Sequence, residues 1–423
     1  MLSILKYKNP GMLSVAILFI AFSFNDWYSL TFGFPTPIQL AIVFGIYNNL
    51  RYRVMMRSGY NSTALIVLAL LYLFIVITYT IMDWSHNPST LFVSIGFNLF
   101  WLLSALPLLS IGIEKEDWRK LCTVFLLVVS VITIPSGYLE LFLGRNILDT
   151  RLGLSDDIFY LRGLHIDKLE FGSILSLAGF IAFVDVVSKD ENQYKPWKIA
   201  ILALVSILLV FSFSTTSMLG FGAGICIIML YMNKKYFIYA PLLLGIGYLF
   251  YSILQNTSLY HSQQSSYELK YKLNVEMYDQ KNFRYLAIEA AEKKIEENLF
   301  FGYGVGQSGK VIQELLGSEK DINTHNFIGN ELLDYGLLGF TPLFVFIVLL
   351  IYLSFKVPED KTPYLNQMNL VVKAVAVFLL FRFFLYYHRF DQAFYVIWAA
   401  LVVTYIASIN NQSVFKNEDI NMR

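Results

Sequence analysis

Residues 333–355 read LDYGLLGFTPLFVFIVLLIYLSF, an apolar run whose single charged residue is Asp334. A helix needs about 20 apolar residues to cross the hydrocarbon core of a bilayer, and this run is long enough. The sequence therefore predicts an all-α polytopic membrane protein with about 12 transmembrane helices. The other predicted spans are Gly11–Leu30, Pro35–Leu50, Ser62–Met82, Thr90–Ile113, Leu121–Leu143, Phe171–Val187, Ile199–Phe213, Met218–Met232, Phe237–Leu254, Met368–His388 and Ala393–Ile409.

The composition agrees with a membrane protein. Hydrophobic residues make up 56% of the chain and charged residues 15%, with a mean hydropathy of +0.55. Soluble domains contain roughly 45–50% apolar and about 25% charged residues. The net charge of +1 gives no preference for nucleic acid. Cys122 and Cys226 lie inside apolar spans, so no disulfide framework or metal site is expected.

Basic residues predict the orientation of the spans. Lysine and arginine concentrate in alternate short segments, such as Arg51–Arg57 and Lys115–Lys120, whereas the short loops near Pro35 and His86 contain none. Because basic loops stay in the cytoplasm, both termini are predicted to be cytoplasmic. The first apolar segment lacks a convincing cleavage site and is interpreted as a span, not a removed signal peptide.

Two of the outer segments are long, and they divide the chain. Residues 1–255 hold spans 1–9 and include an outer loop at 144–170. Residues 256–332 form a large helical outer loop between spans 9 and 10, and residues 333–423 hold spans 10–12. The pair of spans around Ser214–Ser217 is either two helices or one kinked or re-entrant unit.

The large loop contains a predicted amphipathic helix over 282–301. Residues on its apolar face are Ala287, Ile288, Ala291, Ile295 and Leu299, and Arg284 falls in the middle of this face. A guanidinium on a buried face needs a partner. The partner is either a carboxylate of the same loop or a phosphate, whose oxygens fit the planar fork of arginine. A snorkelling stem is a third interpretation.

A glycine run, Gly302–Gly306, follows this helix. Gly304–Lys310 matches the beginning of a phosphate-binding loop, but Val311 stands where a magnesium-binding Ser or Thr is required. The run also follows a helix rather than a strand. We therefore interpret the glycines as a helix terminator, and expect no nucleotide.

Several other residues are candidates for chemistry. His325 precedes Asn326 where the chain returns to the membrane, and histidine can accept a hydroxyl proton near neutral pH. Glu331 and Asp334 either orient His325 or solvate the start of the span.

Further candidates for binding an anionic substrate or lipid head groups are Arg151, Arg162 and His165 in the first outer loop, with local ion pairs as the alternative. Arg382 and Arg389 near the outer end of a span complete the set, whereas snorkelling accounts for Lys373.

The order of these residues resembles the O-antigen polymerase and ligase superfamily. The resemblance rests on Arg284, on Asn298–Gly304, and on His325–Ile328 followed by Glu331–Gly339. It implies a many-span fold with a large periplasmic loop, in the bacterial inner membrane. It also implies transfer of a glycan from a polyprenyl-pyrophosphate carrier to a hydroxyl in the periplasm, with no metal or nucleotide cofactor.

The resemblance implies roles for individual residues. Arg284 would bind the pyrophosphate and help it leave, and His325 would act as base or orienting group for the attacking hydroxyl. Arg151 and Arg162 would hold the second lipid-linked phosphate or the sugar chain; His165, Asn326, Arg382 and Arg389 are further expected substrate contacts. Expected partners are a polyprenyl-pyrophosphate-linked oligosaccharide, membrane lipid and a chain-length regulator protein.

Polymerase and ligase differ in the acceptor, which is a second lipid-linked repeat unit or the lipid A core. Ligases commonly carry an arginine just after the span that ends near Phe213, where this chain has Ser214–Met218. This difference favours the polymerase. A transporter or flippase of a lipid-linked solute is the alternative from another class, but no internal repeat supports it.

Overall fold

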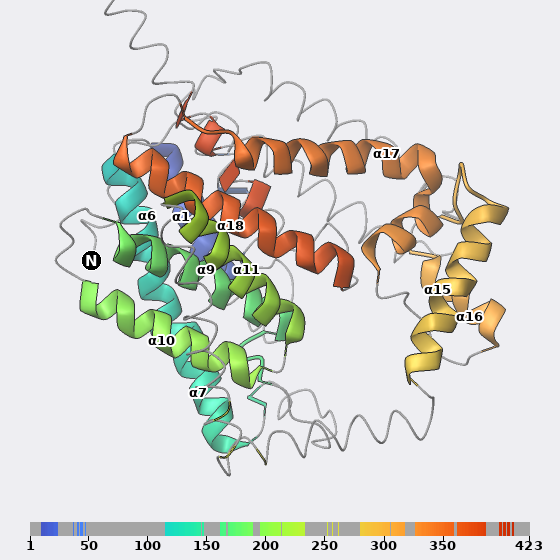
Figure 1. Cartoon of the computed structure of the whole chain (residues 1–423), viewed down its shortest axis with the longest axis horizontal. Coiled ribbons are helices and arrows are strands. Elements are labelled where there is room, and N and C mark those ends of the chain that lie inside the picture. The colour runs from blue at the N-terminus through green and yellow to red at the C-terminus, as the bar shows by residue number, and fades with distance from the viewer. Residues whose placement is uncertain are drawn as a thin grey trace, which may run out of the picture. The chain divides into compact units, whose positions relative to one another are not determined.

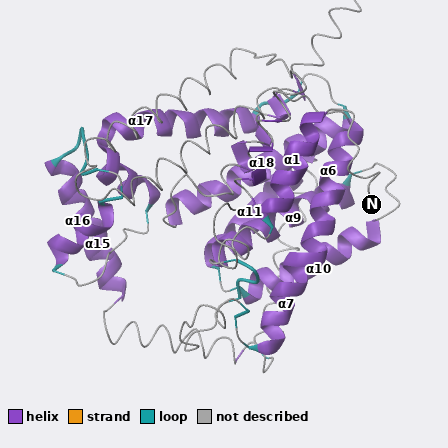
Figure 2. Ribbon diagram, turned by 180° about the vertical axis from the view of Figure 1, so that it is seen from behind, coloured by secondary structure: helices purple, strands orange, loops and turns teal. Residues whose placement is uncertain are grey.

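Every regular element that the structure describes is a helix, and no strand occurs among the described residues (Figures 1 and 2). The structure is a computed structural model. It describes residues 10–23, 115–144, 146–147, 161–165, 168–188, 195–212, 214–232, 280–304, 306–317, 326–358 and 362–385, with scattered residues within 37–47, 252–261 and 397–409. Helical structure here confirms the predicted fold class at the level of secondary structure.

The chain divides into two compact units. The first covers residues 1–41, 113–277 and 357–379, and the second covers 42–112, 278–356 and 380–423. The first unit contains α1 (Pro10–Phe22), α6 (Lys115–Val128), η2 (Val129–Thr133), α7 (Ile134–Leu143), α9 (Lys168–Val187), α10 (Lys195–Phe211), α11 (Thr215–Met232) and most of α18 (Pro363–Leu385). The second contains α15 (Gln280–Glu297), α16 (Ser308–Leu316) and α17 (Phe327–Phe355).

Within the described residues, four stretches of helix are long and apolar enough to cross a membrane. They are Lys115–Leu143, Lys168–Val187, Phe327–Phe355 and Pro363–Phe383, and each overlaps a predicted span. The sequence predicts about 12 spans, more than these four stretches account for. The predicted spans Ser62–Met82 and Thr90–Ile113 lie outside the described residues, as do most of Pro35–Leu50 and Phe237–Leu254. The total number of spans therefore stays a prediction.

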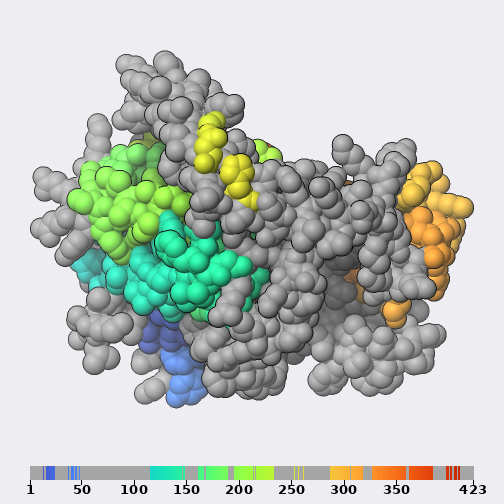
Figure 3. Space-filling model, turned by 90° about the horizontal axis from the view of Figure 1, so that it is seen from below, coloured from blue at the N-terminus to red at the C-terminus, as the bar shows by residue number. Residues whose placement is uncertain are grey.

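The first of these stretches is not a uniform α-helix. It consists of α6, the π-helical segment η2 and α7, with Pro135 in the first turn of α7. Proline has no N–H to donate, and its ring crowds the carbonyl four residues earlier. The wider π turn immediately before Pro135 accommodates both defects. Helix α7 (teal) lies beside α10 (green) in Figure 3.

Helix α9 is central to the first unit, where glycines and phenylalanines interdigitate. A Cβ at Gly179 would lie 2.5 Å from the Phe221 ring, and one at Gly224 would lie 2.4 Å from Phe180. The rings of Phe180 and Phe221 stack at 5.3 Å between centroids. These glycines let α9 and α11 approach closely, as small residues do between membrane helices.

Two lysines in the first unit are buried with partners. Lys198 on α10 forms an ion pair with Asp185 on α9. Lys373 on α18 is 1% exposed, donates to Asn369 Oδ1 at 2.6 Å, and lies 3.7 Å from the Tyr231 ring centroid. The prediction that Lys373 snorkels is therefore wrong, because a cation–π contact and an amide satisfy its charge inside the protein.

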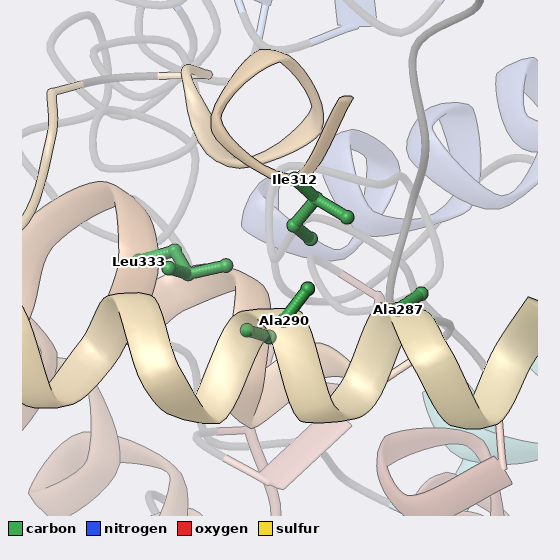
Figure 4. Packing of buried hydrophobic residues seen from close by; sticks show 5 residues of the cluster. Ala287, Ala290, Ile312 and Leu333 are labelled. Carbon is green, nitrogen blue, oxygen red and sulfur yellow. The ribbon is translucent and has the colours of Figure 1, made fainter. Parts of the chain in front are cut away.

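In the second unit, α15 and α16 pack beside the N-terminal end of α17 (Figure 1). Their shared core consists of Ala287, Ala290, Ala291, Ile312 and Leu333 (Figure 4). The predicted helix over 282–301 is confirmed but shorter, because α15 ends at Glu297. Its buried face is also turned from the predicted one, since Ile288 and Leu299 are 40% and 38% exposed.

Candidate functional site

The glycine run after α15 is joined to α17 by backbone hydrogen bonds. Tyr303 N donates to Leu333 O at 2.7 Å, and Gly304 N donates to Asp334 O at 2.9 Å. In the opposite direction, Leu337 N donates to Leu299 O at 2.8 Å and Leu338 N donates to Phe300 O at 3.1 Å. Two of the segments on which the family resemblance rests, Asn298–Gly304 and Glu331–Gly339, are thus in direct contact. We call this junction of 299–304 with 333–338 the clasp.

Two glycines make the clasp possible. Gly302 and Gly336 both have positive φ, at 69° and 59°, and Gly336 interrupts the helical geometry of α17. A Cβ at Gly302 would lie 2.5 Å from Gly336 N, and a Cβ at Gly336 would lie 2.4 Å from Phe300 O. Because backbone lies at these distances, a side chain cannot be accommodated by a rotamer change. Only glycine satisfies both the conformation and the close approach.

Asp334 links the clasp to the start of α16. Its Oδ2 accepts from Gly306 N at 2.9 Å and its Oδ1 accepts from Ser308 N at 2.7 Å, and the residue is 4% exposed. A carboxylate at a helix N-terminus pairs with donors that the helix itself leaves unused. In the apparent phosphate-binding loop, this protein carboxylate thus occupies the backbone donors of Gly306 and Ser308. Of the two roles considered for Asp334, solvation of the start of the span is excluded, because its carboxylate is buried against these donors. The other role, orienting His325, stays a prediction because His325 lies outside the described residues.

The end of α15 is held by Tyr303 and by an ion pair. The Tyr303 hydroxyl donates to Lys294 O at 3.1 Å and to Glu297 Oε2 at 3.3 Å. Lys294 Nζ also lies 2.5 Å from Glu297 Oε2. The hydrogen bond from Lys294 lowers the pKa of the Glu297 carboxyl, and the same contact raises the pKa of Lys294. These contacts fix the exit of the chain from α15, although both charges are solvent-exposed and contribute little to stability.

The beginning of α17 contains several buried polar residues. Asn326 is its N-cap, with Oδ1 accepting from Ile328 N at 2.9 Å and Gly329 N at 3.3 Å. Asn330 is 1% exposed and donates to Asn326 O at 3.1 Å, and Glu331 is 4% exposed. Asn326 thus has a structural role, capping the helix, that was not predicted from the sequence.

Arg382 is buried in the same unit. Arg382 lies on α18 and is fully buried. The adjacent Phe383 packs on Phe327, with 5.1 Å between the ring centroids. The end of α18 therefore lies against the first turn of α17, immediately after the position of His325. His325 itself and Arg389 lie outside the described residues. Arg284 is in helix α15, but its side chain lies outside them as well.

In the first unit, Glu140 organises the predicted outer loop at 144–170. Its Oε1 accepts from Asn146 Nδ2 at 3.2 Å and Ile147 N at 2.9 Å, and its Oε2 accepts from Arg162 N at 2.9 Å and Gly163 N at 2.7 Å. The Glu140 side chain is fully buried at the end of α7. One carboxylate thus holds both ends of the segment between Ile147 and Arg162.

This arrangement places two of the predicted binding residues together. His165 N donates to Arg162 O at 3.0 Å, which closes a tight turn. His165 is 1% exposed, and its ring lies 6.2 Å from that of Phe171. Arg151 lies outside the described residues. No cluster of three metal-binding side chains occurs in the part of the chain that the structure describes.

Neither the role of Glu140 nor the capping role of Asp334 was predicted from the sequence. The available signal was the same in both cases. Each is an isolated acid inside a predicted span, where a charge is costly unless it has partners.

The region that contains the clasp is similar to a known protein family. The model of the family described as O-Antigen ligase, Wzy_C, matches residues 199–344, which include Arg284, His325 and the whole clasp. The match supports the resemblance to the O-antigen polymerase and ligase superfamily. No curated protein matches the chain.

Proposed function

We propose that this protein is an O-antigen or surface polysaccharide polymerase of the bacterial inner membrane. It transfers a glycan from polyprenyl pyrophosphate to a hydroxyl of a second lipid-linked repeat unit at the periplasmic face. The observation that carries the proposal is the family match over 199–344, whose two motif segments meet in the clasp. The family covers O-antigen ligase-like and polymerase-like enzymes, which act as glycosyltransferases on lipid-linked sugars.

In the proposed reaction, the acceptor hydroxyl attacks the anomeric carbon of the donor glycan. A glycosidic bond forms, the bond from that carbon to the pyrophosphate oxygen breaks, and the pyrophosphate leaves with the electron pair. His325 accepts the hydroxyl proton, and Arg284 stabilises the negative charge that develops on the leaving group. Asn326, Arg382 and Arg389 line the substrate path near His325, while Arg151, Arg162 and His165 hold the second phosphate or the sugar chain.

The start of α11 supports the polymerase over the ligase. Ser214 Oγ donates to Ser217 Oγ at 2.8 Å, and Ser214 and Ser217 are 2% and 0% exposed. A Cβ at Gly172 on α9 would lie 2.3 Å from Ser217 Oγ. The place where ligases commonly carry an arginine is therefore filled by small, close-packed side chains. The matching family is described as O-antigen ligase, and this description favours the ligase, which is the second candidate.

The deciding experiment compares surface glycan from a deletion strain with that from complemented strains. If the protein is a polymerase, the deletion strain should carry a single repeat unit on its lipid A core. Long carrier-linked chains with bare core would identify a ligase instead. Unchanged glycan on both core and carrier would contradict both assignments and leave the transporter interpretation.

Site variants test the assigned residues in the same strain. Arg284→Ala and His325→Ala are each expected to abolish long-chain glycan while the protein still inserts, as measured by immunoblotting of membranes. Lys293→Ala, which removes an exposed charge from the same helix as Arg284, is the matched control and should restore the full ladder. A full ladder from both site variants would show that these roles are wrong.

A further inference from the structure

Two adjacent aromatic residues are exposed at the turn that follows α15. Phe300 and Phe301 are 60% and 62% exposed. The exposed surface of α15 leading to them is largely charged, with Glu289, Glu292, Lys293 and Glu296 among its members. Two neighbouring exposed phenylalanines beside these charged residues mark a candidate interaction surface.

The clasp holds this turn firmly against the membrane-spanning helix. Phe300 O accepts from Leu338 N at 3.1 Å, and Leu299 O accepts from Leu337 N at 2.8 Å. Gly302 and Gly336 allow the two backbones to touch on the other side of the turn. The hydrogen bonds to α17 therefore help to set the position of the two phenylalanines, in addition to the contacts that Tyr303 makes with α15.

Leu338 also begins an exposed apolar stripe on α17. Leu338, Val345, Val348 and Tyr352 are 51%, 42%, 46% and 67% exposed, at spacings that place them on one helical face. The opposite face, with Leu343, Phe346, Leu350 and Leu353, is buried in the protein. Helix α17 is long and apolar enough to span a membrane, and an exposed apolar stripe on such a helix is suited to contact with acyl chains.

We propose that Phe300 and Phe301 insert into the outer leaflet of the bilayer and anchor the large loop to the membrane surface. They continue the lipid-facing stripe of α17 directly, because Phe300 O accepts the hydrogen bond from Leu338 N. Large apolar side chains next to charged ones are typical of segments that lie in the membrane interface. The occupant is the phospholipid bilayer, because continuity with the lipid-facing stripe singles it out over a second copy of the chain.

Spin-label accessibility tests this proposal on the full chain. Cys122→Ala and Cys226→Ala remove the native thiols, and Phe301→Cys then carries a nitroxide in proteoliposomes of phosphatidylcholine and phosphatidylglycerol. Oxygen concentrates in the bilayer, whereas a nickel chelate stays in water. We expect the ratio of oxygen to nickel collisions at position 301 to be several-fold higher than at Glu296→Cys. It should approach the ratio at Val345→Cys.

Two results would overturn the anchor. A nickel-dominated label at position 301, equal to that at 296, would place the turn in water. A label shielded from both reagents would show a protein contact, including one with a second copy. Because these vesicles contain no polyprenyl substrate, the outcome is independent of the proposed reaction, and the loss of one proposal leaves the other standing.

Discussion

At the scale of single residues, Asp334 and Glu140 perform the same task in different units. Each is a buried carboxylate on a membrane-spanning helix that accepts backbone N–H groups from an adjoining connection. A carboxylate accepts such bonds better than a neutral group, because charge-assisted bonds are roughly twice as strong. Hydrogen bonds from several donors offset the free-energy cost of burying each acid. The acid in turn determines where those donors lie.

Asp334→Ala should loosen the start of α16. The N–H groups of half-buried Gly306 and buried Ser308 lose their acceptor, and the loss at Ser308 costs roughly 1–3 kcal/mol. Asp334→Asn keeps one acceptor oxygen and should have about half the effect. The measurement is the thermal unfolding midpoint of the purified protein, with exposed Glu296→Gln as the control. An unchanged midpoint in Asp334→Ala would contradict the capping role.

Glu140→Gln should release the first outer loop without preventing insertion. The amide nitrogen faces two of the four donors that Glu140 accepts, so the hydrogen bonds at one end of the loop are lost. We expect faster limited proteolysis between Ile147 and Arg162. Shorter or less abundant glycan chains should accompany it. Glu116→Gln, at the exposed start of the same span, should behave like the wild type.

At the scale of elements, the clasp depends on backbone approach rather than on side-chain burial. Gly302, Gly317 and Gly336 all have φ between 59° and 69°. At Gly302 and Gly336, backbone atoms lie closer than 3 Å to the position that a Cβ would take, whereas nothing lies within 4 Å of that position at Gly317. A side chain at Gly317 would therefore meet only conformational strain, whereas one at Gly302 or Gly336 would also collide with backbone atoms.

Alanine at these three glycines should therefore have unequal effects. Gly317→Ala should cost about 1–2 kcal/mol, because an L-residue is disfavoured in the left-handed conformation. Gly302→Ala and Gly336→Ala should break the clasp and sharply reduce the amount of folded protein in membranes. Size-exclusion profiles and immunoblots measure this difference. Equal yields from all three variants would show that the backbones do not meet.

The register of α15 shows what a helical pattern predicts and what it misses. The apolar stripe correctly predicted a helix with Ala287 and Ala291 buried. It wrongly placed Ile288 in the core and omitted Ala290, because residue size as well as polarity decides which face another helix can approach. Ile312 of α16 packs on the alanines of this face, where the short side chains leave room.

At the scale of the whole molecule, the predicted topology sets where the loops lie. Basic residues concentrate in alternate segments, so both termini are predicted inside and residues 256–332 outside. A fluorescent protein fused after Arg423 should fluoresce in the cytoplasm. Alkaline phosphatase inserted after Gly317 should be active in the periplasm. Inactive phosphatase at Gly317 with a fluorescent C-terminus would mean that the number of intervening spans is wrong by one.

Hydropathy and residue order were enough to predict a helical membrane protein, the four spans that the described helices support, and the segments that carry the family resemblance. These features are local, because hydropathy and residue order are properties of neighbouring residues. Three contacts could be seen only in the folded chain: Asp334 caps α16, Glu140 binds both ends of a loop segment, and Gly302 lies against Gly336. Their partners are separated from them by intervening chain, and hydrogen-bond acceptors are chosen by which backbones the packing of helices brings within reach.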